Sequence, residues 1–173
     1  MSKFWKGTYI IVLSLVLIIL LYNLRERVEQ FKNFGYFGVF VISLISSGTV
    51  LLPAPGWVAV IGLATSLNPL ILGLVAGVGS SLGELTSYFL GLGGRFITDK
   101  KFDWLQNLMK KHGMKILFVL ALIPNPIFDV GGIIAGASKM KIHNFLIPVL
   151  CGKIIRFIAV AYVASIGWKF LIN

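Results

Sequence analysis

The sequence predicts an all-α integral membrane protein. In this fold, two re-entrant helical hairpins, each followed by a transmembrane helix, form an inverted repeat behind an N-terminal anchor helix. The first reason is composition, since 57% of the 173 residues are apolar and only 13% are charged. With a mean hydropathy of +0.91, the chain is too hydrophobic for a water-soluble domain.

The second reason is a layout that occurs twice. An apolar half-span meets a P-x-P break, a second apolar stretch follows, and a long hydrophobic segment then holds an ionisable residue. The first proline and that residue lie 31 positions apart from Pro53 to Glu84, and 32 apart from Pro124 to Arg156. Interrupted apolar segments at matching places in two halves are typical of transporters with a site near the bilayer midplane.

The first predicted unit, residues 1–34, combines a transmembrane anchor with an interfacial segment. Residues 4–24 run from Lys3 and Lys6 into an apolar stretch that also resembles a signal peptide. No small-x-small cleavage pattern follows it, which favours an uncleaved anchor. Residues 23–33 are polar, with apolar residues at helical spacing, as in an interfacial helix.

The second unit, residues 35–173, is a membrane domain whose first repeat covers residues 36–92. Pro53 and Pro55 remove two amide donors and break the apolar segment. Lipid cannot satisfy the freed backbone groups, so such a break must be buried in protein or face water. The return stretch, residues 56–67, has 12 residues where a crossing needs about 20, which predicts a re-entrant hairpin.

Residues 70–92 are long enough to cross the bilayer. Six small or polar residues follow one another there at steps of 4, 3, 4, 3 and 4, and therefore share one helical face. Small residues allow helices to pack closely, so this face is predicted to point into the protein. The six are Gly73, Gly77, Ser80, Glu84, Ser87 and Gly91.

Residues 95–115 form a connector with six basic and two acidic residues, predicted to be an amphipathic helix on the membrane surface. Its apolar stripe consists of Trp104, Leu105, Leu108, Met109 and His112.

The second repeat, residues 116–172, has its own half-span, a break at Pro124-Asn125-Pro126, a return over residues 127–138 and a final crossing over residues 145–172. This order of segments matches the first repeat.

Counting basic residues predicts the topology. With the N-terminus cytoplasmic, ten Lys and Arg residues lie inside and four outside, as the positive-inside rule requires. The two hairpins then enter from opposite faces. The chain is expected in the cell membrane as a multi-pass protein.

Glu84 and Arg156 are each placed near the middle of the hydrocarbon core, where a charge is expensive and by default functional or paired. The two residues could form a purely structural ion pair with each other. Lys153, one turn before Arg156, could join it in attracting a phosphate or carboxylate. Asp129 could be the N-cap of the returning half-helix, or could bind a proton or an amine headgroup.

These residues, with the polar groups at the two breaks, form the predicted substrate path. Its members are Ser46, Ser47, Pro53, Pro55, Glu84, Pro124, Asn125, Pro126, Asp129, Lys153 and Arg156.

The sequence contains no H-E-x-x-H, G-x-S-x-G or Walker A motif, which argues against an enzyme. No metal site or cofactor is expected. The net charge of +10 comes from residues that flank apolar segments, so anionic lipid headgroups are the expected partners and nucleic acid is not. A homo-oligomer is compatible with this pattern.

Three stretches resemble the VTT-domain proteins, also called the DedA or SNARE-associated Golgi protein family. They read SSGTVLLPAPGW, NPLILGLVAGVGSSLGELTSYFLGLGGR and IPNPIFDVGGIIAGASKMKIHNFLIPVLCGKIIR. The resemblance covers roughly residues 34–156. It implies two opposed re-entrant hairpins and a role in moving lipids between leaflets, with Glu84, Asp129 and Arg156 as the family's helix glutamate, hairpin aspartate and last-helix basic residue.

The chain departs from many members of that family. Ser46-Ser47-Gly48 and Trp57 stand where acidic residues flank the first break, and Ala121 stands where an arginine often precedes the second. The leading expectation is therefore a lipid transporter or scramblase for phospholipid or polyprenyl-phosphate headgroups. The alternatives are a proton- or ion-coupled transporter of a small solute and a non-transporting assembly or scaffold protein.

Overall fold

The structure, a computed structural model, describes residues 35–48, 55–93, 103–123 and 127–172. The elements in these ranges are all helices, and the described residues contain no strand. The helices are α2 (Gly35–Gly48), α3 (Pro55–Leu63), α4 (Pro69–Gly83), α5 (Leu85–Leu92), α6 (Asp103–Leu122), α7 (Ile127–Ala137) and α8 (Ile142–Ile172). The predicted anchor, the interfacial segment and the break residues Pro53, Pro124, Asn125 and Pro126 lie outside the described residues.

Two stretches of the described chain are long and apolar enough to cross a membrane. They are Pro69–Leu92, with 24 residues, and Ile142–Gly167, with 26. Helices α2 and α7 are apolar but have only 14 and 11 residues, fewer than a crossing needs. The expected all-α architecture is confirmed.

Helices α2 and α3 form an antiparallel hairpin. At one end, the amide of Asn68, just beyond α3, donates to the hydroxyl of Tyr36 at the start of α2 at 3.1 Å. At the other end, a Cβ on Gly56 would lie 2.7 Å from the hydroxyl oxygen of Ser46. The chain therefore returns to the point where α2 began.

Helices α6 and α7 form the second hairpin. Helix α6 is kinked at His112, whose φ of −140° and ψ of 36° are not helical. The predicted connector was expected to end at residue 115, so it meets the second half-span three residues earlier than expected. A Cβ on Gly113, just after the kink, would lie 2.5 Å from the terminal methyl carbon of Met140. The chain after α7 therefore lies beside the start of the second half-span, as the chain after α3 lies beside the start of α2.

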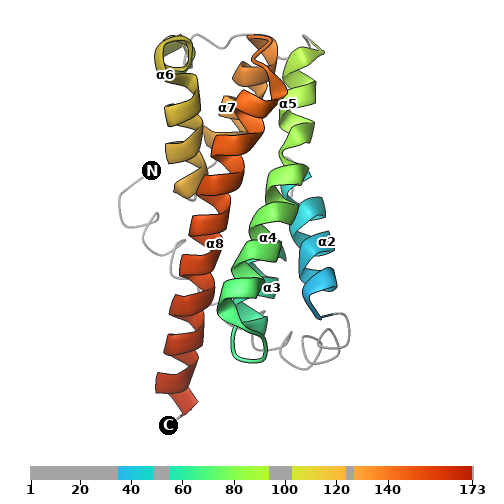
Figure 1. Ribbon diagram of the computed structural model, residues 1–173, viewed down its shortest axis with the longest axis vertical. Helices are drawn as coiled ribbons and strands as arrows, with labels where there is room; N and C mark the ends of the chain where they lie inside the picture. The colour runs from blue at the N-terminus through green and yellow to red at the C-terminus, as the bar shows by residue number, and fades with distance from the viewer. Residues whose placement is uncertain (1–34, 49–54, 94–102, 124–126, 173) are drawn as a thin grey trace, which may run out of the picture.

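The two hairpins lie toward opposite ends of α8, which runs the length of the molecule (Figure 1). Helices α2, α3 and α4 occupy one half, and α5, α6 and α7 occupy the other. Each half has its own cluster of buried apolar residues, centred on Leu72 and Phe157 in the first and on Leu117 and Phe145 in the second. The end of α2 and the start of α7 both approach the middle.

Glycines set the helix separations. A Cβ on Gly77 would lie 2.7 Å from the Cα of Ile154 on α8, so the backbones of α4 and α8 are nearly in contact. Gly79 and Gly83 lie similarly against the carbonyl oxygens of Phe40 and Leu44 on α2. Close packing through small residues is a common source of stability for helices in membranes.

The predicted connector stripe is only partly directed toward lipid. Leu105 and Met109 are buried in the core cluster of the second half, whereas Trp104 and Leu108 are exposed. The stripe therefore serves protein packing as well as any membrane contact.

Candidate functional site

All six residues of the predicted face on residues 70–92 are buried, as the spacing indicated. The long helix is divided at Glu84 into α4 and α5. Backbone hydrogen bonding nevertheless continues, since the Glu84 amide donates to Ser80 and the Tyr88 amide to Glu84. The glutamate thus stands at a junction between two helices that share one crossing.

The Glu84 carboxylate forms an ion pair with the ammonium group of Lys153 on α8. Glu84 is 4% exposed and Lys153 2%, so both groups are removed from solvent. The ammonium group also donates to the Ser80 hydroxyl at 2.8 Å, and it lies 5.1 Å from the centre of the Phe128 ring. Two charges are tolerated here because each supplies the other's counter-ion.

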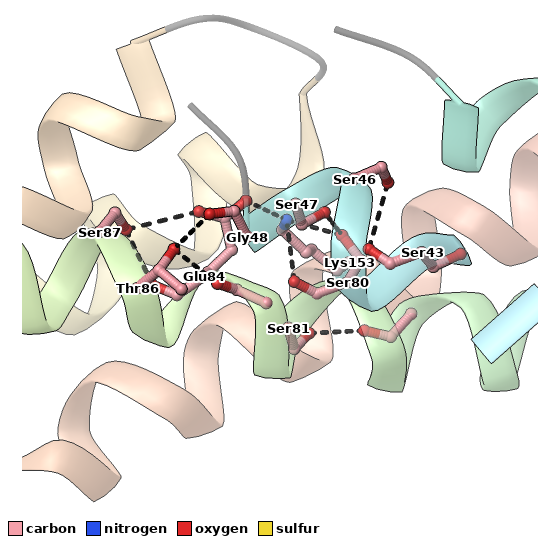
Figure 2. Close-up of polar contacts among 12 residues, drawn as sticks. Ser43, Ser46, Ser47, Gly48, Ser80, Ser81, Glu84, Thr86, Ser87 and Lys153 are labelled. Atoms are coloured by element: carbon pink, nitrogen blue, oxygen red, sulfur yellow. Dashed lines mark hydrogen bonds and ion pairs between the residues drawn. The ribbon is translucent and has the colours of Figure 1, made fainter. Parts of the chain in front are cut away.

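Serine hydroxyls extend this pair along the helices (Figure 2). The hydroxyl groups of Ser47 on α2 and Ser80 share a hydrogen bond of 2.6 Å. On the other side, Ser87 donates to the Glu84 carbonyl at 2.8 Å. We call Ser47, Ser80, Glu84, Ser87 and Lys153 the polar seam.

The end of the first hairpin is attached to this seam at a second point. Thr86 donates its hydroxyl both to the Gly48 carbonyl at 3.1 Å and to the Gly83 carbonyl at 2.9 Å. The last residue of α2 therefore contacts the helix junction directly (Figure 2).

The expected ion pair between Glu84 and Arg156 is wrong, because the Glu84 carboxylate pairs with the ammonium group of Lys153 instead. The Arg156 guanidinium lies 5.1 Å from the ring centres of both Trp57 and Phe157. Within the described residues, its Nε is buried without a hydrogen-bond partner. Lys153 is therefore paired with a carboxylate, whereas Arg156 makes contacts with aromatic rings.

Asp129 does not cap α7, contrary to one of the two predicted roles. The helix begins at Ile127, so Asp129 is its third residue and lies in the first turn. A carboxylate there still interacts favourably with the positive end of the helix dipole. The side chain is half-buried and within electrostatic reach of Lys153 and Glu84.

The structure thus brings Ser47, Glu84, Asp129 and Lys153 together, with Arg156 one helical turn further along α8. Ser46 lies close by, and its hydroxyl donates to the Ser43 carbonyl at 3.2 Å. Pro55 is the first residue of α3. The remaining break residues are not described.

Ser80, Ser87, Trp57 and Phe128 belong to the site but were absent from the predicted path. The signal for Ser80 and Ser87 was present, because both share the helical face of Glu84. The signal for the two aromatic rings was not, since their contacts depend on how separate helices meet.

The seam and its neighbours Asp129 and Arg156 supply hydroxyl groups, two carboxylates and two cations, but among the described residues they form no arrangement typical of a metal centre. No group of three or more metal-ligating side chains gathers among the residues that the structure describes. The arrangement is suited to holding a polar or charged group that lies between helices in an apolar surrounding.

Comparison with known proteins identifies the family. A model of the VTT domain matches residues 52–166, well over half of the chain. Two vacuole membrane proteins of Arabidopsis thaliana are similar. KMS2 is 30% identical over 101 residues, covering 46% of this chain and 24% of that protein. KMS1 is 29% identical over 103 residues, covering 46% of this chain and 25% of that protein.

The chain spans about a quarter of the length of these curated relatives. No solved structure matches it. The family match covers the first membrane-crossing stretch, all but the last residue of the second, and the whole polar seam except Ser47. The chain belongs to the VTT-domain family of membrane proteins.

Proposed function

We propose that this protein is a lipid transporter or scramblase. It lets the headgroup of a phospholipid or a polyprenyl phosphate pass between leaflets while the hydrocarbon tails stay in the bilayer. It has no enzymatic activity, and membrane lipids are its partners. Family membership and the all-helical apolar fold support a membrane role, and the seam supports the passage of something polar.

The observation that carries the proposal is the position of the polar seam. Glu84 is 8 residues from the end of the span Pro69–Leu92, and Lys153 is 11 residues from the start of the span Ile142–Gly167. At 1.5 Å per residue these depths are roughly 12 and 17 Å, close to the middle of a hydrocarbon core about 30 Å thick. Buried charges at that depth are expensive and mark substrate paths in many transporters.

The proposal includes an orientation. The hairpins α2–α3 and α6–α7 enter the cell membrane from opposite faces as an inverted repeat, with the N-terminus cytoplasmic, and their ends meet at the seam. Their matching contacts support this, since α2 packs on α4 as α6 packs on α8, and α3 contacts α8 as α7 contacts α5.

A proteoliposome assay tests the function. Vesicles carrying a trace of fluorescent phospholipid are treated with dithionite, which quenches only the outer leaflet. We expect quenching to proceed beyond half of the signal when the protein is present and to stop at half in protein-free vesicles. Identical traces in both, from protein shown to be folded, contradict the proposal and favour the scaffold alternative.

A second candidate, a proton-coupled transporter, is favoured by the closeness of two carboxyl groups, Glu84 and Asp129. Coupled transport requires a group that gains and loses a proton during the cycle. Imposing and then collapsing a proton gradient across the vesicles separates the candidates, because a scramblase works equally well without it.

A further inference from the structure

Five exposed lysines gather at one end of the molecule, where the kink of α6 meets the turn before α8. These two segments are in close contact, since a Cβ on Gly113 would lie 2.5 Å from the terminal methyl carbon of Met140. Every lysine of the group lies within three positions of one of these two residues. We call the group the basic surface; its members are Lys110, Lys111, Lys115, Lys139 and Lys141.

The protein compensates little of this charge. The described residues include three acidic side chains, of which Glu84 and Asp129 lie at the polar seam. The third, Asp103, is on α6, two turns before Lys110. Within the ranges that the structure describes, no ion pair joins a lysine of the basic surface to a carboxylate. The surface therefore has an excess of positive charge that a partner could neutralise.

The part of α6 before its kink is placed to lie along a membrane surface. Figure 1 shows this part nearly end-on, across the long axis of the molecule, whereas the part after the kink runs beside α8. Leu105 and Met109 attach it to the core of the second half, while Trp104 and Leu108 are 50% and 37% exposed. Tryptophan favours the boundary between headgroups and acyl chains, so this level corresponds to the edge of the bilayer.

The turn before α8 is held rigidly at the same end. The Tyr88 hydroxyl on α5 donates to the Met140 carbonyl, and the Tyr88 ring stacks on that of Phe145 with 5.0 Å between ring centres. Lys139 has a φ of 53°, a left-handed conformation that commonly ends a helix. The two lysines of this turn are thus exposed on a fixed support, next to those of α6.

From this arrangement we infer that the basic surface binds anionic lipid headgroups of the leaflet that it faces, and that these lipids hold the kink of α6 against the turn before α8. Clusters of lysine beside a membrane span attract anionic lipids, and Trp104 and Leu108 would enter the acyl layer below the headgroups. A soluble acidic partner would neutralise the lysines but leave those two side chains in water.

This surface is separate from the polar seam. Lys141 precedes Lys153 by 12 residues, which is roughly 18 Å along a helix at 1.5 Å per residue. The inference therefore requires that the chain lie in a membrane, which its family supports, but not that it moves lipids. Its failure would leave the proposed function standing.

Native mass spectrometry of the purified protein in detergent tests the binding, with dioleoyl phosphatidylglycerol and dioleoyl phosphatidylcholine as probes. We expect phosphatidylglycerol to bind roughly five times more tightly. In about 0.5 M ammonium acetate the preference should shrink, because salt screens exposed charges. Equal affinities, or a preference that salt leaves unchanged, overturn the inference, and this comparison needs no variant.

Three combined variants locate the site. Changing the five lysines of the basic surface to glutamine should abolish the preference, whereas changing them to arginine, which keeps the charge, should preserve it. A charge control replaces Arg25, Arg27 and Lys32 with glutamine, at positions predicted to lie on the other side of the membrane, and should also preserve it. A preference that survives the first variant, or that the control abolishes as well, overturns the assignment.

Hydrogen exchange in nanodiscs tests whether the lipids hold the two segments together. Discs that contain phosphatidylglycerol should slow exchange several-fold in peptides from residues 103–115 and 137–144, relative to discs of phosphatidylcholine alone, and leave peptides from α4 unchanged. Exchange that is the same in both kinds of disc contradicts this role. Inorganic phosphate added to phosphatidylcholine discs should have no effect, and equal slowing by phosphate would overturn the choice of a lipid ligand.

Discussion

The ammonium group of Lys153 on α8 is held by the carboxylate of Glu84, 69 residues earlier on the other crossing. The two residues come from different halves of the chain. Their contact joins the two spans at a point buried in the protein, and several of the following expectations depend on it.

Replacing one member of this pair should lower the free energy of unfolding more than replacing both members. Lys153→Met or Glu84→Gln alone leaves one buried group without its partner, at a cost of about 3 to 5 kcal/mol. The double variant Glu84→Gln/Lys153→Met removes both charges and should recover most of that loss. Free energies of unfolding, measured by SDS titration in mixed micelles, check this. A double variant as unstable as the sum of the two single variants would contradict it.

The glycine contacts predict a position-dependent effect of a single methyl group. Gly77→Ala places a Cβ 2.7 Å from the Ile154 Cα, whereas Gly167→Ala meets nothing within 4 Å. Overpacking of this kind costs roughly 1 to 3 kcal/mol, so the first variant should unfold at a lower SDS fraction. The second should unfold like the wild type.

The end of the first hairpin should loosen when its side-chain hydrogen bonds are removed. Ser47→Ala removes the contact with Ser80, and Thr86→Val removes the donor to the Gly48 carbonyl. Each net hydrogen bond contributes about 0.5 to 1.5 kcal/mol. Hydrogen exchange in peptides from residues 40–48 should therefore accelerate several-fold. Unchanged exchange in the combined variant would show that other contacts hold α2 in place.

The proposed topology predicts which residues share a face of the membrane. In a Cys151→Ser background, single cysteines at Phe37 and Ser66 should react with an impermeant thiol reagent from the extracellular side. Cysteines at Lys115 and Lys139 should react only from the cytoplasmic side. Labelling of positions 37 and 66 from opposite sides would contradict the proposed topology, because it would mean that α2 and α3 together make a single crossing of the bilayer.

Arg156→Lys should impair transport although the charge is retained. The compact ammonium group cannot stack on Trp57 and Phe157 as the planar guanidinium does, nor contact a phosphate with two parallel donors. We expect the flipping rate to fall several-fold, while Lys141→Arg, at an exposed position before α8, should not change it. A fully active Arg156→Lys variant would mean that charge alone suffices.

Much of the fold was predictable from local signals. Proline breaks and apolar lengths located α2, α3, α7 and both crossings to within a few residues. The step pattern of Gly73 to Gly91 identified the buried face, because a helix fixes which residues share a side.

The partner of Glu84 was not predictable in the same way. Helical periodicity gives the direction of a side chain but not the axial offset between two helices. That offset is set by backbone contacts such as Gly73 with Ile158 and Gly77 with Ile154, and it places Lys153 rather than Arg156 opposite the glutamate. Likewise, a stripe such as Leu105 and Met109 indicates an apolar neighbour without distinguishing protein from lipid.

The sequence separation of the Glu84 and Lys153 pair has a consequence for biogenesis. A ribosome adding about 5 to 20 residues per second takes roughly 3 to 14 s to proceed from one to the other. During that interval the nascent chain carries a glutamate whose neutralising residue has not yet been made. The first crossing therefore gains the buried partner of its glutamate only after the last crossing is synthesised.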